Sequence, residues 1–216
     1  MQLFNRAPKV HTNRSGTKSP VGIQFLLTHA RAGMHRTEAG SVIAFTSANP
    51  GAGVSHVVRQ LGAQLAKQTH EPTAIVEAER LAKLRSTELI NLRAKCARTN
   101  IDQLWMLRTS ANGNGHQPNG DSLNISEPAN GLDCVRGLRA SFTHTLLDCP
   151  SISESETAPY LAPQVDGVVL VVEADLTRRD QIVRARQTIE MAGGNLVAVV
   201  LNKRRHLVPE WLYRLL

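Results

Sequence analysis

The chain has 216 residues, 42% of them hydrophobic and 20% charged, with a formal net charge of +7, which suits one buried core with tails. No run approaches the roughly 18 continuous apolar residues of a membrane span, so we expect a cytoplasmic protein. The basic residues are spread along the chain and aromatic residues make up only 4% of it, so nucleic-acid binding is not expected.

Residues 1–36 are predicted to form a basic N-terminal arm. The first 20 residues are polar and contain no acidic residue, but they carry Arg6, Lys9, Arg14 and Lys18. Such a segment buries too little apolar surface to order itself, so the arm is expected to be partly disordered. Residues 21–36 are predicted to form a short helix that leads into a domain spanning residues 37–208.

Within that domain the apolar pattern alternates between buried strands and amphipathic helices. Strands are predicted at residues 42–46, 73–77, 104–107, 144–148, 168–173 and 196–202. Helices are predicted after residue 54 and over residues 79–98, 132–141 and 177–192, with a long loop at 111–131. Continuous apolar strands separated by helices indicate an α/β fold with a parallel β-sheet flanked by helices on both faces.

The segment TSANPGAGVSH, residues 46–56, joins the first of these strands to the first helix. A P-loop reads GxxxxGK[ST] at such a position, because backbone N–H groups and the helix N-terminus bind phosphate while the lysine neutralises its charge. Gly53 and Ser55 are retained here, but Ala48 replaces the first glycine and Val54 replaces the lysine. Taken alone, these eight residues fit a simple glycine-containing turn equally well.

The segments TSANPGAGVS, AIVEAERL, TLLDCP, VDGVVLVVEADLT and VVLNKRR follow one another in a familiar order. In order and spacing, residues 40–204 resemble the cytoplasmic domain of bacterial tyrosine kinases (BY-kinases), the autokinases of capsule and exopolysaccharide assembly. That family is related to the ParA/MinD-type ATPases. The resemblance implies a P-loop NTPase-like fold, ATP or ADP with Mg²⁺ as cofactors, and a membrane polysaccharide co-polymerase (Wzz-like) as partner. It also implies a position peripheral to the inner membrane through that partner, and it allows a homo-oligomer.

The resemblance further implies a set of site residues. Those that would contact nucleotide are Pro50, Gly51, Ala52, Gly53, Val54, Ser55, His56 and Asn202. Ser55, Asp148 and Glu77 would lie on the Mg²⁺ side, and Glu77 is the one candidate catalytic side chain. Each has a plainer alternative, since Asp148 could be an ordinary strand-end carboxylate, Asn202 a turn cap and Glu77 a solvated residue.

The chain departs from the family pattern at several of these positions. The family's loop reads SxxPGEGKS, so Ala52 and Val54 differ, and its Asp-x-Asp signature appears as Glu77-Ala78-Glu79, followed by Arg80. Loss of the lysine should weaken nucleotide binding by about tenfold to a hundredfold. Glutamate is one methylene longer than aspartate, whereas Mg²⁺ requires near-octahedral geometry at short distances. Phosphoryl transfer should therefore suffer more than binding.

The C-terminal segment differs from the family as well. Only Tyr213 lies near the end, where the family has a tyrosine cluster, and the family's Glu-x-x-Arg-x-x-Arg oligomerisation sequence is not found, which argues against ring formation. Residues 209–216 are predicted to form an amphipathic helix that packs on its own domain or docks on a partner or an anionic bilayer.

We therefore expect a degenerate, catalytically impaired BY-kinase-like protein that regulates exopolysaccharide or capsule biosynthesis or export. Two alternatives stay open. One is an active ATP-dependent protein tyrosine autokinase with a substitute cation such as Arg80. The other is a partition-type positioning ATPase.

Overall fold

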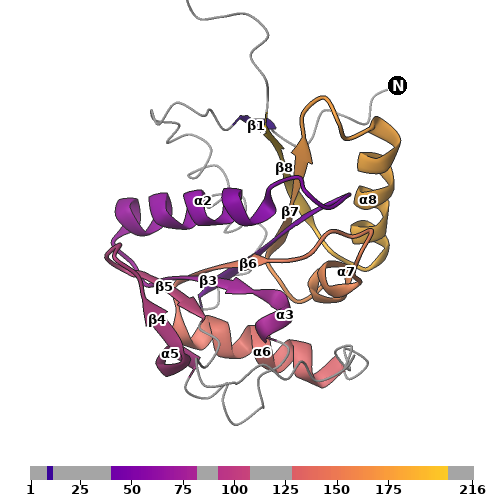
Figure 1. Ribbon diagram of the computed structural model, residues 1–216. Coiled ribbons are helices and arrows are strands. Elements are labelled where there is room, and N and C mark those ends of the chain that lie inside the picture. The colour runs from indigo at the N-terminus through magenta and orange to yellow at the C-terminus, as the bar shows by residue number, and fades with distance from the viewer. Residues whose placement is uncertain (1–8, 12–39, 82–91, 108–127, 204–216) are drawn as a thin grey trace, which may run out of the picture.

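The computed structural model describes residues 9–11, 40–81, 92–107 and 128–203 (Figure 1). The predicted helix at 21–36, most of the loop at 111–131, the C-terminal helix at 209–216 and Tyr213 lie outside these ranges. The elements are β1 (Lys9–His11), β2 (Ser41–Ser47), α2 (Val54–Thr69), β3 (Thr73–Glu77), α3 (Ala78–Leu81), α5 (Leu92–Lys95), β4 (Cys96–Arg98), β5 (Leu104–Leu107), α6 (Pro128–Ser141), β6 (His144–Asp148), α7 (Thr157–Leu161), β7 (Gly167–Glu173), α8 (Arg179–Met191) and β8 (Leu196–Asn202).

The described strands form one sheet in the order β1-β8-β7-β2-β6-β3-β5-β4. All neighbouring strands are parallel except β4, which runs antiparallel to β5. The six predicted strands and the predicted parallel sheet are confirmed. Because β3, β6, β2, β7 and β8 are parallel neighbours, their carboxyl ends meet at one edge of the sheet, where α/β proteins bind ligands.

Helices cover both faces of the sheet, as predicted (Figure 1). Along β2, Val42 and Ala44 pack with residues of α6, α7 and α8, whereas Ile43 and Phe45 pack with residues of α2. This alternation is the two-residue period of a strand that is buried on both sides. Among the described helices it places α2 on one face and α6, α7 and α8 on the other, with the N-terminus of α2 following the carboxyl end of β2. Among the described residues, no helix has the length and apolar content to cross a membrane.

The edges of the sheet differ from the predictions. Residues 96–98, predicted as helix, form strand β4, and α6 begins at residue 128, inside the predicted loop. Strand β1 and the five-residue helix α7 were not predicted. The guanidinium groups of Arg93 in α5 and Arg98 in β4 lie 4.5 and 5.4 Å from the ring centre of Trp105 on β5. Cation–π contact and strand pairing with β5 stabilise this edge more than helix propensity does.

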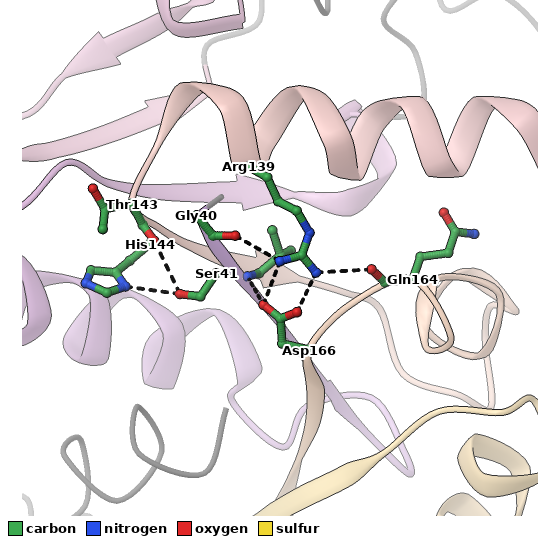
Figure 2. Close-up of polar contacts among 8 residues, drawn as sticks. Gly40, Ser41, Arg139, Thr143, His144, Gln164 and Asp166 are labelled. Atoms are coloured by element: carbon green, nitrogen blue, oxygen red, sulfur yellow. Dashed lines mark hydrogen bonds and ion pairs between the residues drawn. The ribbon is translucent and has the colours of Figure 1, made fainter. Parts of the chain in front are cut away.

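A buried ion pair lies at the end of the sheet where β2 and β7 begin (Figure 2). Arg139 of α6 contacts both carboxylate oxygens of Asp166, which precedes β7. The same guanidinium donates to Gly40 O at 2.8 Å, and Asp166 also accepts the Val42 N–H at 2.7 Å. The side chains are only 17% and 3% exposed. This network joins α6, β2 and β7 at the end of the sheet away from the glycine-rich loop.

Candidate functional site

The glycine-rich loop, residues 48–53, turns directly from β2 into α2. Gly51 and Gly53 have φ angles of 81° and 85°, in the left-handed region that glycine adopts without steric cost. Gly53 is the N-cap of α2 and provides no side-chain cap. Val57 donates its N–H to Gly53 O at 3.1 Å, so the N–H groups just before it stay available at the positive end of the helix. This geometry suits an anion such as phosphate.

Two residues that follow one another at the end of β8 hold carbonyl groups of the loop. Asn202 is 8% exposed, and its Nδ2 donates to Ala52 O at 2.9 Å. Lys203 Nζ donates to Gly51 O at 2.5 Å and pairs with Glu173 Oε1 at 3.1 Å. A Cβ atom at Gly53 would collide with the Asn202 side chain. Asn202 therefore lies beside the loop, and its contact with a nucleotide stays a prediction. Lys203 is a contact that sequence reasoning missed, although its place directly after Asn202 was a signal.

A pocket of about 380 Å³ opens between this loop, the carboxyl ends of β3 and β6 and the segment after β6. Its lining residues are Ser47, Pro50, Gly51, Ala52, Gly53, Val54, Ser55, Glu77, Glu79, Asp148, Cys149, Pro150, Ser151 and Glu154. The pocket thus brings together the loop residues from 50 to 55 with Asp148 and Glu77. His56 and Asn202 were predicted site residues too, but neither lines the pocket, and His56 is exposed on the first turn of α2.

The lining of the pocket is acidic. Glu77, Glu79, Asp148 and Glu154 contribute carboxylates, and in the described part of the chain no lysine or arginine lines the pocket. Arg80 is near, but its Nε lies 2.5 Å from Glu77 Oε2, and both side chains are more than a third exposed. Surface pairs of this kind contribute about 1 kcal/mol or less. The four carboxylates therefore oppose a phosphate group, and a cation that enters with it would offset their charge.

Asp148 points toward the loop from the end of β6. Its neighbours in the sheet are Phe45 of β2 and Glu77 of β3, and the Ser55 side chain is close enough to influence its carboxylate. Burial raises the pKa of Asp148 above its usual range and the nearby Glu77 raises it further, while Ser55 and Arg59 lower it. The acid at the strand end and Ser55 in the first turn of α2 thus line the same pocket.

The carboxylate of Asp148 and the hydroxyl of Ser55 could bind a Mg²⁺ ion whose other ligands are water and phosphate. Among the residues that the structure describes, no three His, Cys, Asp or Glu side chains are arranged to hold a metal ion. Mg²⁺ commonly takes one or two protein carboxylates and completes its shell with water and substrate phosphates. Asp148 and Ser55 suit a Mg²⁺ ion that arrives with a phosphate ligand, whereas Glu77 is paired with Arg80.

The segment after β6 forms the other wall of the pocket and is hydrogen-bonded to the end of β2. Thr46 Oγ1 donates to Pro150 O at 2.6 Å, and the Ile152 N–H donates to Ser47 O at 2.9 Å. Buried Ser151 donates its hydroxyl to Glu154 Oε2 at 2.6 Å. Sequence analysis did not single out Ser151 or Glu154, whose only signal was their place just after Asp-x-Pro.

Comparison with known proteins shows sequence similarity to a tyrosine-protein kinase over part of the chain. No family model matches the chain. The chain is 28% identical over 69 residues to the tyrosine-protein kinase CpsD of Streptococcus agalactiae. This match covers 32% of the chain and 30% of CpsD, so it spans less than a third of the length of that curated relative.

The similarity of fold extends over most of the chain. The chimerical protein CapA2B2 superposes with a TM-score of 0.65 and 21% identity, over 91% of this chain and 92% of that one. The kinase domain of the Escherichia coli tyrosine kinase ETK gives 0.64 and 18%, over 87% and 77%. The septum site-determining protein MinD of Pyrococcus horikoshii, in complex with Mg-ADP, gives 0.57 and 14%, over 82% and 77%.

These matches confirm the predicted resemblance to bacterial tyrosine kinases and the predicted relation to MinD-type ATPases. At such low identities the structural likeness is one of fold. The chain therefore has the α/β fold shared by bacterial tyrosine kinase domains and MinD, and over about a third of its length it is similar in sequence to the tyrosine kinase CpsD.

Proposed function

We propose that this chain binds Mg²⁺-nucleotide in the pocket and regulates exopolysaccharide or capsule biosynthesis or export, with phosphoryl transfer impaired. One observation carries the proposal: the pocket beside the glycine-rich loop is lined by four carboxylates, and the loop has Val54 where a P-loop has lysine. The backbone part of a phosphate site is present, while the cationic side chain that supports transfer is replaced.

Backbone groups would bind the phosphates of the nucleotide, and side chains would bind Mg²⁺. The loop N–H groups from Gly51 to Ser55 would donate to the phosphates, since α2 begins there with free donors. Asp148 and Ser55 would hold Mg²⁺, whose charge neutralises the phosphates. The acidic lining makes this metal necessary, because none of the described residues that line the pocket is a lysine or an arginine.

Phosphoryl transfer requires more than binding. The transferring group carries charge that cationic side chains stabilise in the transition state, and removal of one such contact costs about a hundredfold to a thousandfold in rate. Arg80, considered as a substitute, is paired with Glu77 and does not line the pocket. Its position outside the lining favours the impaired form over an active autokinase. The partition-type alternative has no support beyond the net charge and the MinD-like fold.

Phosphotransfer to protein measures this proposal directly. The purified protein is incubated with saturating Mg²⁺-ATP labelled at the γ-phosphate, beside the ETK kinase domain as an active control. We expect the labelling rate to be at least about a hundredfold below that of the control. Labelling at a comparable rate, abolished by Asp148→Asn, would show an active kinase and overturn the impairment.

We further propose, by the resemblance alone, that the chain works in the cytoplasm beside the inner membrane with a polysaccharide co-polymerase, as a monomer or a homo-oligomer. Fractionation of cells with and without the co-polymerase checks this point. The protein should sediment with membranes only when the co-polymerase is present. Equal distribution in both cells would refute the partnership.

A further inference from the structure

The end of β8 contacts the glycine-rich loop across about 150 residues of sequence. Asn202 Nδ2 donates to Ala52 O at 2.9 Å and Lys203 Nζ donates to Gly51 O at 2.5 Å. Two consecutive side chains thus satisfy two consecutive carbonyl groups of the loop. With these carbonyls bonded at the β8 side, the neighbouring N–H groups remain free for the pocket side.

Lys203 is itself fixed at both ends. Its backbone has a φ of 56°, a left-handed conformation that is uncommon for a residue with a Cβ atom. Directly before it, Asn202 O accepts the N–H of Ala174 at 2.9 Å. At the other end, the Lys203 ammonium lies 3.1 Å from Glu173 Oε1, a side chain that is 17% exposed. Strands β7 and β8 therefore both orient the amine.

We propose that Asn202, Lys203 and Glu173 form a loop clamp that keeps the glycine-rich loop in its phosphate-binding shape before any ligand arrives. Lys203 is then a positioning residue that acts through Gly51. The inference rests on the proposed function for its ligand, Mg²⁺-nucleotide. A loop that is already ordered loses less conformational freedom on binding. Because this loop has no lysine to attract the phosphates, its affinity for nucleotide depends more on being ordered before binding.

The clamp predicts an effect that can be measured without ligand. Backbone ¹⁵N relaxation is recorded on the protein and on Lys203→Met, which keeps an aliphatic stem but removes the donor and the charge. Order parameters at Gly51, Ala52 and Gly53 should be about 0.85 in the parent and should fall to about 0.6 or lower in the variant. Lys67→Met, on the exposed last turn of α2, is the matched control and should leave them unchanged.

Calorimetric titration with Mg²⁺-ADP adds the functional readout. Lys203 is 44% exposed, so its loss should weaken the affinity by only about threefold to tenfold. Lys203→Arg should restore most of the affinity, and Glu173→Gln should weaken it less than Lys203→Met does. A purely structural role of Lys203 would not produce this rescue together with a change confined to the loop.

The outcomes separate the clamp from the proposed function. Unchanged order parameters in Lys203→Met would overturn the clamp, as would an equal loss of order in β7 and β8. If the parent binds no Mg²⁺-ADP, the proposed function fails, while loop order in the variant still decides whether the clamp exists.

Discussion

At residue 54 a valine lines the pocket at the position where a P-loop places its lysine. Val54→Lys restores a cation beside the free N–H groups of the loop. We predict that the affinity for Mg²⁺-ADP rises by about tenfold to a hundredfold, the value of one charge-assisted contact to phosphate. Calorimetry measures this change, with Val54→Met as the uncharged control of similar length. An equal effect of both variants would mean that side-chain length, not charge, limits binding.

Asp148 makes the stability of the folded protein depend on pH. Burial raises its pKa, so the folded protein binds this proton more readily than the unfolded chain does. The stability from this group is complete below the ordinary aspartate pKa of about 3.9 and is lost as the pH rises through the raised pKa. We predict that Asp148→Asn unfolds at a higher temperature than the parent at neutral pH. Thermal unfolding from pH 3 to 8 should show the difference vanish in acid, whereas a constant difference would contradict it.

Single residues differed in how far the sequence could identify them. Gly51, Gly53 and Ser55 belong to a local motif, and Asp148 ends a buried strand. The motif and the strand end could both be recognised from residues that are adjacent in the sequence. Lys203 reaches Gly51, and Glu173 reaches Lys203, only because β7 lies between β2 and β8 in the sheet. Such contacts depend on strand order, which local patterns do not contain.

Elements were predictable where the apolar signal was long enough. The central strands are continuous apolar runs and were identified almost to their ends. Strand β4 has three residues and α7 has five, too few to display a period of 2 or 3.6. At β4 the contacts with Trp105 come from the tertiary structure and override the helical pattern.

Helix α6 is attached to the sheet by the Arg139–Asp166 ion pair (Figure 2). Arg139→Met would leave the carboxylate of Asp166 buried with the Val42 N–H as its remaining partner. We predict a loss of about 3–5 kcal/mol in the free energy of unfolding, the usual cost of breaking a buried pair on one side. Denaturant unfolding measures it.

The matched control lies on the same helix. Arg136 is 68% exposed and faces Asp133 at 3.9 Å, so Arg136→Met should change the free energy of unfolding by less than about 0.5 kcal/mol. Similar losses in the two variants would indicate that methionine disturbs the helix itself and that the buried pair contributes little.

At the scale of the whole molecule, the fold collects four carboxylates and a set of free backbone N–H groups at one edge of the sheet. The net charge of +7 does not compensate for this locally, because no lysine or arginine among the described residues lines the pocket. The phosphates of a nucleotide must therefore bring their positive charge with them. The central claim is that Mg²⁺, and not a side chain, supplies that charge.

Calorimetric titration of the unchanged protein with ADP, once with Mg²⁺ and once with a chelator, tests this claim most directly. We predict measurable binding with Mg²⁺ and an affinity at least about tenfold weaker without it, which corresponds to 1.4 kcal/mol or more. Equal affinities in the two titrations, or no binding in either, would contradict the claim.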